Sequence, residues 1–410
     1  MKRAPDTGSS GGYCHIPTSD GATVAIKRKP IPGGPPIIFI HGIAVNAELW
    51  DLPEVKGPDF TFRSLASLLH EVGYDLWLMS LRGHGTVTLR SEPPAGQEDW
   101  CVDHFIVYDL PAVIDHVRQQ TGQRPIVIGA SMGSMTLAGY VQGATAVQTG
   151  QGEQGLKIVA EPALARTRQE KLAGCVFAEF PAALRWPDAL YDASGKLDWR
   201  VLLRDWWRHD PDANFPVEVL SRWGWLQALV GAVGEIPLAW LGGRGSGEPW
   251  YRRLPAPLAE RIEQLEVGAL EALMRIAGVF TGQSNHRAEV MLHGRRFIFD
   301  TMKAGVLQQM AKCVRQRAFV SALGTPDHVY SDHYALVTAP VLVVQGGRDR
   351  IANPDIVRSV FFDGIASDDK EFMFDPDVAH GEIEAAPLAC ERLYPRIIAW
   401  IAAHSPTRRG

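Results

Sequence analysis

Hydrophobic positions form short apolar runs that alternate with amphipathic stretches over the first 180 residues. The spacing predicts a hairpin over residues 18–30 around Asp20-Gly21, because polar and apolar positions alternate over residues 23–27 after the turn. Beyond it the pattern predicts buried strands at 36–40, 75–81, 126–128 and 172–180, and helices at 62–72 and 107–120. Strands and helices that follow one another in turn predict an α/β fold with a mostly parallel central sheet, covered on both faces.

In the middle of the chain, apolar residues recur with a different period. Between residues 181 and 337 apolar residues recur about every 3.6 positions, which predicts helices at 199–207, 216–233, 258–276, 287–297 and 306–319. The strand pattern returns at 340–344 and 371–374, and an amphipathic helix is expected at 387–403. We therefore expect a core made of residues 1–180 and 338–410, with a large helical lid, residues 181–337, inserted after the sixth strand.

A candidate nucleophile lies between a buried strand and a helix. Gly129-Ala130-Ser131-Met132-Gly133 follows the apolar run 125–128 and precedes the helical stretch 134–141. A sharp turn between strand and helix exposes a nucleophilic serine, and side chains at 129 and 133 would collide with the neighbouring strand and helix. The motif alone arises by chance roughly 0.2 times in a chain with 40 glycines in 410 residues, so its position supplies the specificity. Ser131 is expected to attack an acyl group.

A serine hydroxyl needs a histidine to take its proton and a carboxylate to orient that histidine. In this topology both partners should follow late strands, the acid first. Asp349 lies in a glycine turn after the strand at 340–344, and His380 follows the strand at 371–374. The competing interpretations are a helix N-cap for Asp349 and an ordinary surface position for His380. Glu179, at the end of the sixth strand, is the alternative acid.

Two backbone amides should stabilise the oxyanion that forms when an ester carbonyl is attacked, each lowering the barrier by roughly 3 kcal/mol. The serine turn offers the amide of Met132, and the sharp turn at His41-Gly42-Ile43 offers the amide of Ile43. We expect His41 to orient this loop rather than to act as a second base. The turn at 82–85 (Arg-Gly-His-Gly) is expected to be structural.

Composition and charge exclude several classes of protein. A net charge of −5, with no long run of one sign, argues against nucleic-acid binding. The five cysteines are scattered without C-x-x-C spacing, so neither a zinc site nor a disulfide framework is indicated. No cofactor or metal is expected.

The basic N-terminus is not followed by an apolar segment, so we expect a cytoplasmic protein. No apolar run reaches the roughly 18 residues of a transmembrane segment.

With Ser131, Asp349, His380 and the 41–42 and 82–85 turns, the chain resembles an α/β-hydrolase over residues 18–185 and 336–405. The segments Thr18-Ser-Asp-Gly21, Tyr108-Asp-Leu-Pro-Ala112 and Thr121-Gly-Gln123, together with Asn46 and Trp50, are similar to the acid lipase branch of this fold. Members of that branch hydrolyse carboxylic esters of lipids and sterols. The resemblance implies that Ser131 is the nucleophile, Asp349 the acid, His380 the base, and the Ile43 and Met132 amides the oxyanion hole.

Two sequence differences from that branch mean that its substrates cannot simply be assigned to this chain. Acid lipases usually carry Gly-His-Ser-Gln-Gly at the serine turn, and an aspartate where this chain has Glu382. Similar hairpin and loop features occur in hydrolase modules related to polyhydroxyalkanoate synthases, but those use a cysteine nucleophile. Ser131 therefore indicates hydrolysis rather than polymer synthesis.

Aromatic residues in the predicted lid bear on the substrate. Eight of the 12 tryptophans lie there, which suggests an apolar cavity for a hydrophobic ester, or simply the packing of a small helical domain. They are Trp186, Trp199, Trp206, Trp207, Trp223, Trp225, Trp240 and Trp250.

A serine esterase or lipase acting on a small hydrophobic ester is the first hypothesis. Acyl transfer, amide or carbon–carbon bond hydrolysis by the same triad, and a non-catalytic binding module are the alternatives; the sequence does not determine the oligomeric state.

Overall fold

An eight-stranded sheet organises the computed structural model, which describes residues 12–86, 89–150, 155–185, 285–287, 289–291, 298, 300 and 302–406. Its order is β1-β2-β6-β3-β7-β10-β11-β12. The β1–β2 and β2–β6 pairs are antiparallel, and the other pairs of this sheet are parallel. The predicted mostly parallel sheet is therefore confirmed. The strands are β1 (Tyr13–Pro17), β2 (Thr23–Lys29), β3 (Pro36–Ile40), β6 (Asp75–Met79), β7 (Ile126–Ala130), β10 (Gly174–Ala178), β11 (Val341–Gly346) and β12 (Lys370–Asp375).

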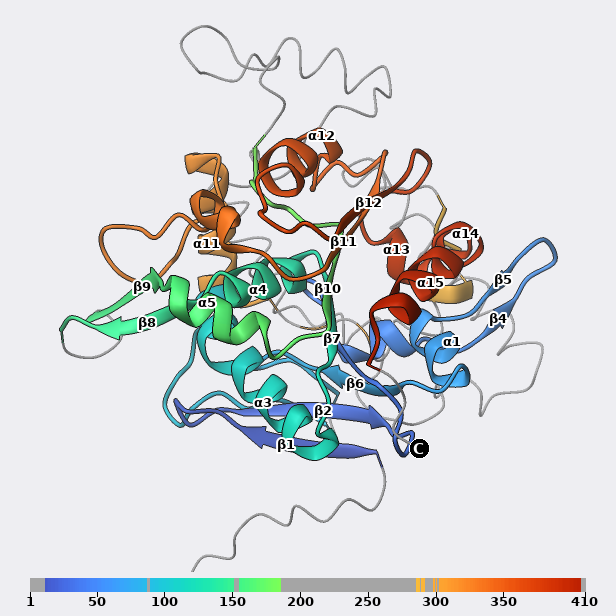
Figure 1. Ribbon diagram of the computed structural model, residues 1–410, viewed down its shortest axis with the longest axis horizontal. Helices are drawn as coiled ribbons and strands as arrows, with labels where there is room; N and C mark the ends of the chain where they lie inside the picture. Colours follow the sequence, from blue (N-terminus) through green and yellow to red (C-terminus); the bar gives the residue numbers. More distant parts are fainter. Residues whose placement is uncertain are drawn as a thin grey trace, which may run out of the picture.

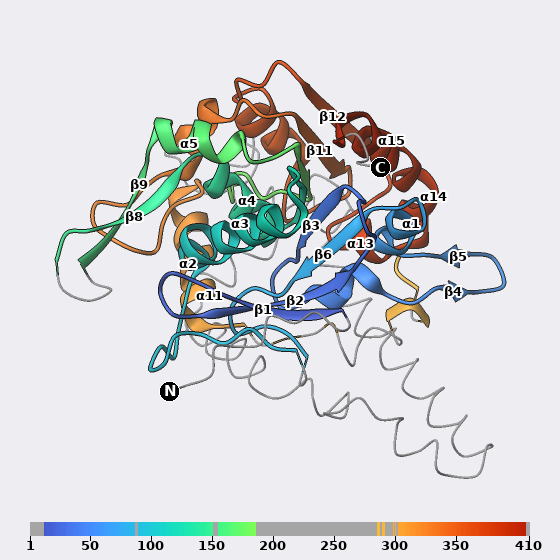
Figure 2. The same ribbon diagram turned by 60° about the horizontal axis from the view of Figure 1, so that its bottom comes forward.

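Helices cover both faces of this sheet. In β3, Ile38 and Ile40 belong to the same apolar cluster as residues of α3 (Leu110–Thr121) and α4 (Met132–Val141). Ile37 and Phe39 belong to a second cluster, which includes α1 (Leu65–Glu71) and α15 (Tyr394–His404). Figures 1 and 2 show the two helical layers on opposite sides of the sheet. Because central strands are buried on both faces, they have continuous apolar runs instead of alternating ones.

Helix boundaries differ from those predicted. The helix expected at 62–72 begins at Leu65, because Ser64 caps it by accepting a hydrogen bond from the Ser67 amide, and Thr61–Phe62 instead forms β5 with β4 (Val55–Lys56). The helix expected at 387–403 is divided into α14 (Pro387–Arg392) and α15. Pro395 lies in the first turn of α15, where its missing N–H costs nothing.

A hairpin and a helix between α4 and β10 were not predicted. Strands β8 (Ala144–Gln148) and β9 (Leu156–Ala160) pair antiparallel in a sheet of their own, and α5 (Pro162–Gln169) follows. Most residues of both strands are half-buried, so they lack the apolar runs that identify the central strands. Figure 1 shows the hairpin beside α5, away from the central sheet.

Among the described residues, the helices not yet named are short, apart from α11. They are η1 (Ala47–Asp51), α2 (Val102–His104), the π-helical η2 (Phe105–Asp109), α11 (Ala304–Gln316), η7 (Tyr330–Leu336), α12 (Pro354–Ile356), the π-helical η8 (Val357–Phe362) and α13 (Glu382–Ala385). The segments α2, η2 and α3 follow one another directly, so the helix predicted at 107–120 begins earlier, after Cys101. None of the helices in the described ranges is long and apolar enough to cross a membrane.

Only part of the predicted lid can be compared with the structure. Helix α11 corresponds to the helix predicted at 306–319. The helices expected at 199–207, 216–233 and 258–276, most of 287–297, and the eight tryptophans lie outside the described residues. The lid and its boundaries, 181–337, therefore stay a prediction.

Residues 298 and 300 of this segment lie against loops of the core. The Asn46 amide donates to the Ile298 carbonyl at 2.9 Å, and the Asp300 amide donates to the Ala44 carbonyl at 2.8 Å. The Asp300 carboxylate accepts a hydrogen bond from the Gly85 amide at 2.7 Å. This part of the segment therefore contacts the loops that follow β3 and β6.

Candidate active site

Ser131 occupies a sharp turn between β7 and α4. Its φ of 51° lies in the left-handed region, which is rarely adopted by residues other than glycine. A Cβ atom at Gly133 would lie 2.5 Å from the Ile40 carbonyl oxygen, and one at Gly129 would lie 2.6 Å from the carbonyl carbon of Gly133. The collisions expected from the sequence are therefore present, and glycine at both positions allows the helix to start close against β3.

The structure brings Ser131, His380 and Asp349 into one hydrogen-bonded chain. His380 Nε2 lies 2.9 Å from Ser131 Oγ, and His380 Nδ1 lies 2.9 Å from Asp349 Oδ2 and 3.1 Å from Oδ1. Ser131 and Asp349 follow β7 and β11 and His380 follows β12, so all three come from the carboxyl ends of parallel strands. Burial alone would lower the pKa of His380, but the Asp349 carboxylate raises it above the usual 6.5.

Asp349 is held in place by its own turn. Its Oδ1 accepts hydrogen bonds from the amides of Ile351 at 2.9 Å and Ala352 at 2.7 Å, and its Oδ2 accepts one from the Gln345 side chain at 3.1 Å. The helix N-cap nearby is Asn353, which bonds the amides of α12. The N-cap interpretation of Asp349 is therefore wrong. Its carboxylate is fixed by neighbouring donors and faces His380.

Glu179, the alternative acid, has other partners. Its carboxylate accepts hydrogen bonds from the Gly381 amide at 2.6 Å and the Ile383 amide at 3.0 Å. These amides belong to the first and third residues after His380. Glu179 therefore holds the backbone of the histidine loop, whereas Asp349 bonds the imidazole itself. The position of Glu179 at the end of a buried strand is the sequence feature that made it an alternative acid.

The loop after β3 passes close to Ser131. A Cβ atom at Gly42 would lie 3.3 Å from Ser131 Cβ, and Ile43 is the next residue. Met132 is the first residue of α4. His41 Nδ1 lies 2.7 Å from the Gly42 carbonyl oxygen, and its Nε2 accepts from the Leu81 amide at 3.0 Å. Burial, with the charge of nearby His84, lowers the pKa of His41 to about 3, so it stays neutral and orients the loop.

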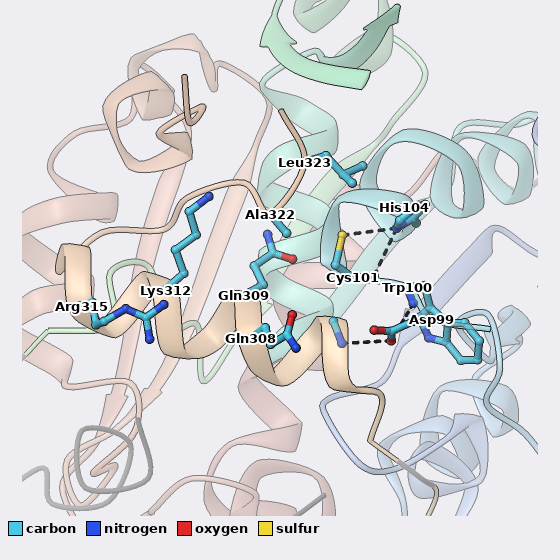
Figure 3. Close-up of a pocket in the computed structure, with 11 residues that line it drawn as sticks. Asp99, Trp100, Cys101, His104, Gln308, Gln309, Lys312, Arg315, Ala322 and Leu323 are labelled. Carbon is cyan, nitrogen blue, oxygen red and sulfur yellow. Dashed lines mark hydrogen bonds between the residues drawn. The ribbon is translucent and has the colours of Figure 1, made fainter. Parts of the chain in front are cut away.

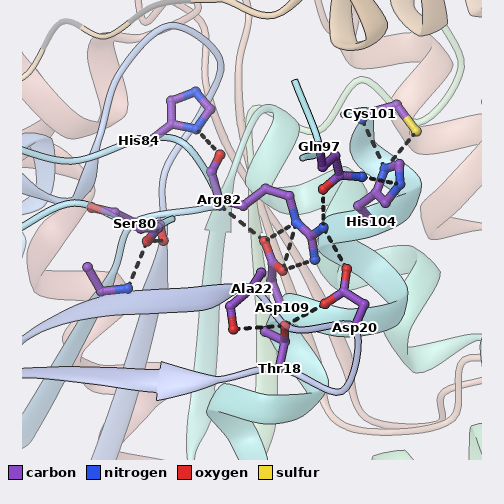
Figure 4. Close-up of polar contacts among 12 residues, drawn as sticks. Thr18, Asp20, Ala22, Ser80, Arg82, His84, Gln97, Cys101, His104 and Asp109 are labelled. Carbon is purple, nitrogen blue, oxygen red and sulfur yellow. Dashed lines mark hydrogen bonds and ion pairs between the residues drawn. The ribbon is translucent and has the colours of Figure 1, made fainter. Parts of the chain in front are cut away.

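Arg82 forms a buried network that the sequence did not indicate. Its guanidinium bonds Asp109 at 2.6 Å, Asp20 at 2.7 Å and the Gln97 side chain at 3.0 Å (Figure 4). The Asp109 carboxylate also accepts the Arg82 amide at 3.1 Å. The network joins the first hairpin, the turn after β6 and the start of α3, so the turn at 82–85 is structural, as expected. Asp20 and Asp109 both come from the segments that carry the likeness to acid lipases.

A cavity of about 480 Å³ lies between α11 and the residues around Trp100 (Figure 3). Its lining contains none of Ser131, His380 and Asp349. Lys312 and Arg315 line one side on α11, and Cys101 and His104 line the other. We assign this cavity no part in the site.

Comparison with known proteins agrees with this topology. Residues 35–145, from β3 into β8, match the family model described as alpha/beta hydrolase fold. In the structure, the serine turn, the acid turn and the histidine loop follow parallel strands of an eight-stranded sheet in chain order. The protein has the α/β-hydrolase fold.

Curated proteins that match part of this chain include lipases. The chain is 33% identical over 141 residues to human gastric triacylglycerol lipase, and 30% identical over 141 residues to lipase lipl-3 of Caenorhabditis elegans. Each alignment covers 31% of this chain and 33% of the relative. The chain thus spans about a third of the length of the relatives that it matches. Among solved structures, monoacylglycerol lipase of Paleococcus ferrophilus covers 93% of this chain and 99% of its own, with 16% identity and a TM-score of 0.46.

Proposed function

We propose that this protein is a serine hydrolase that cleaves carboxylic esters with a hydrophobic acyl or alcohol part. Ser131 is the nucleophile, His380 the general base and acid, and Asp349 the residue that orients His380. The observation that carries the proposal is the hydrogen-bonded chain from Ser131 Oγ through His380 to Asp349. The names of the lipases that match this chain support ester substrates.

The first half of the reaction acylates Ser131. His380 Nε2 takes the hydroxyl proton while Oγ forms a bond to the ester carbonyl carbon, and the carbonyl oxygen becomes an oxyanion. The amides of Ile43 and Met132 donate hydrogen bonds to this oxyanion. The intermediate then expels the alcohol, which takes its proton from His380, and an acyl-enzyme remains.

The second half hydrolyses the acyl-enzyme. His380 takes a proton from water while the water oxygen attacks the acyl carbon, and the same two amides hold the new oxyanion. Collapse of this intermediate breaks the bond to Oγ, returns the proton to Ser131 and releases the carboxylic acid. Asp349 holds Nδ1–H of His380 in both halves and stabilises the imidazolium that forms.

The segment between β10 and β11 is proposed to shape the substrate site. Its described residues 298 and 300 contact the loops after β3 and β6. These strands are parallel to β7, so both loops leave the same edge of the sheet as the serine turn. The tryptophans at 186–250 would give this lid an apolar lining for a hydrophobic acyl or alcohol group.

Labelling with a fluorophosphonate tests the nucleophile. The probe should modify Ser131, as mapped by peptide mass spectrometry, and Ser131→Ala or His380→Ala should abolish the labelling. His404→Ala is a matched control, because His404 lies on α15 and bonds Asp369 rather than the serine. Labelling of His380→Ala at the rate of the unsubstituted protein would refute the assignment of the base.

A panel of p-nitrophenyl esters from acetate to palmitate tests the substrate class. A hydrophobic acyl pocket should raise kcat/KM with chain length, since each buried methylene contributes about 0.8 kcal/mol. Activity confined to the shortest esters would contradict the hydrophobic substrate while leaving the serine mechanism intact.

A further inference from the structure

The backbone on both sides of His380 is held by buried carboxylates. The Gly381 amide donates to Glu179 at 2.6 Å, and the Ala379 amide donates to Glu382 Oε2 at 2.9 Å. Glu179 comes from the end of β10, whereas Glu382 begins α13 and reaches back to the residue before the histidine. The backbone position of the histidine therefore depends on both carboxylates.

Glu382 also binds the segment between β10 and β11. The Asn285 backbone amide donates to Glu382 Oε1 at 2.7 Å, and the Asn285 side-chain amide donates to Oε2 at 2.8 Å. The same side-chain amide donates to the Asp377 carbonyl oxygen at 2.7 Å. Asn285 therefore contacts the histidine loop both before and after His380.

Three N–H groups converge on the two oxygens of Glu382. The residue is 0% exposed, so its carboxylate depends on protein donors rather than on water. An ionised carboxylate offers acceptors only, and both of its oxygens are used here. A glutamine at this position would place an NH₂ group where one oxygen now accepts, and two donors would then face each other. The contact therefore requires the carboxylate itself.

Buried apolar side chains hold the same part of the segment near the histidine loop. Val290 and Ile298 are fully buried and belong to one apolar cluster with Ala385, the last residue of α13. The segment is therefore fixed beside α13 by apolar surface as well as by the polar contact at Asn285.

We propose that Glu382 and Asn285 are positioning residues for His380, so that the segment between β10 and β11 holds the catalytic base in place. The inference rests on the proposed function, in which His380 is the base. Glu382 fixes the amide before the histidine, and Asn285 fixes both Glu382 and the Asp377 carbonyl. Loss of this contact lets the loop move, and the imidazole then loses its alignment with the nucleophile and the acid.

Substitutions of the two residues test the effect on catalysis. Glu382→Gln should lower kcat by about ten- to a hundredfold, because a displacement of the base by about 1 Å has an effect of that size. Asn285→Ala should lower kcat by about tenfold, since its backbone amide still donates to Glu382. KM for a soluble p-nitrophenyl ester should change little, and the rate of fluorophosphonate labelling should fall with kcat.

Two control variants lie on the same elements but outside the contact. Glu371→Gln changes an exposed glutamate on β12, the strand that leads to the histidine loop. Arg287→Ala removes an exposed ion pair with Asp59, close to Asn285 in sequence but outside the histidine loop. Both variants should keep the kcat of the unsubstituted protein. A raised KM with unchanged kcat in Asn285→Ala would mean that this residue shapes the substrate site and does not position the base.

NMR titration of the His380 ring gives a readout that needs no substrate. Asp349 raises the pKa of this imidazole above 6.5 through the contact at 2.9 Å. In Glu382→Gln the loop shift weakens that contact, so the pKa of His380 should fall toward 6.5. Glu371→Gln should leave it unchanged, and His380→Ala assigns the resonance.

A double-mutant cycle of Asn285→Ala and Glu382→Ala, measured by urea unfolding, tests the contact itself. Both changes remove the same side-chain hydrogen bond, so their losses in the free energy of unfolding should be coupled. Additive losses would overturn the contact.

The remaining outcomes are distinct. Coupled losses with an unchanged kcat and an unchanged pKa of His380 in Glu382→Gln would overturn the positioning role. If the unsubstituted protein hydrolyses no ester and resists the fluorophosphonate, the proposed function fails. The double-mutant cycle and the NMR titration then still decide whether the segment holds His380.

Discussion

At the scale of single residues, the candidate site depends on which acid bonds the imidazole. Asp349 and Glu179 are both buried carboxylates that follow neighbouring strands, and both lie near His380. Only their hydrogen bonds distinguish them: Asp349 contacts Nδ1, whereas Glu179 contacts two backbone amides. Substitutions of Asp349 and of Glu179 should therefore impair activity for different reasons.

Asp349→Asn should lower kcat by about 10⁴-fold, because an amide no longer holds the tautomer that accepts the serine proton. Steady-state hydrolysis of a soluble p-nitrophenyl ester measures this loss. Asp377→Asn is the matched control, since Asp377 is half-exposed and pairs with Arg392 at the surface. A loss of less than tenfold in Asp349→Asn would return Glu179 to consideration as the acid.

The same contact makes a prediction about pH. His380 must be neutral to accept a proton, and Asp349 raises its pKa above 6.5. The acid limb of kcat/KM should therefore have its midpoint above pH 6.5, with activity rising as pH increases through it. A profile of kcat/KM from about pH 5 to 9 tests this. A midpoint below 6.5 would contradict the charge assigned to Asp349.

At the scale of elements, the serine turn depends on how closely α4 approaches β3. The missing side chain at Gly133 lets the helix start against the backbone of Ile40 and His41. A Cβ atom at Gly139, six residues later in the same helix, would lie 2.6 Å from the Ile106 side chain. Backbone cannot move without disturbing the strand, whereas a side chain can change rotamer.

Gly133→Ala should therefore destabilise the protein more than Gly139→Ala does. We expect a loss of about 1–3 kcal/mol in the free energy of unfolding for Gly133→Ala, with reduced labelling of Ser131 by the fluorophosphonate. Urea unfolding of both variants measures the difference. Equal losses of unfolding free energy in the two variants would mean that the contact of position 133 with β3 is not what makes Gly133→Ala destabilising.

At the scale of the whole molecule, the Arg82 network joins parts that are distant in sequence. Asp20 lies in the first hairpin, Arg82 after β6 and Asp109 before α3, and both Arg82 and Asp109 are fully buried. A buried charge without its partner is costly, whereas replacing both partners by apolar residues costs much less.

Asp109→Leu should lower the free energy of unfolding by about 3–5 kcal/mol, because it leaves Arg82 with only its Asp20 and Gln97 partners. Adding Arg82→Met to this variant should restore part of the loss. The double-mutant cycle is measured by urea unfolding. A double variant whose loss equals the sum of the single losses would show that the pair is not coupled.

The sequence by itself determined the elements that depend on local pattern. The central strands have continuous apolar runs because both of their faces are buried, and the serine turn has glycines because its backbone conformation and close contacts require them. For this reason the mostly parallel sheet, its late strands and the position of Ser131 could be predicted. The half-buried hairpin β8–β9 has no such run, and it was missed.

Only the tertiary structure decided which distant side chains meet. Asp349 and Glu179 have the same chemistry and similar positions after a strand, so no local pattern could assign one to the imidazole and the other to the loop. These assignments depend on strand order and loop geometry, which bring residues more than 200 positions apart into contact.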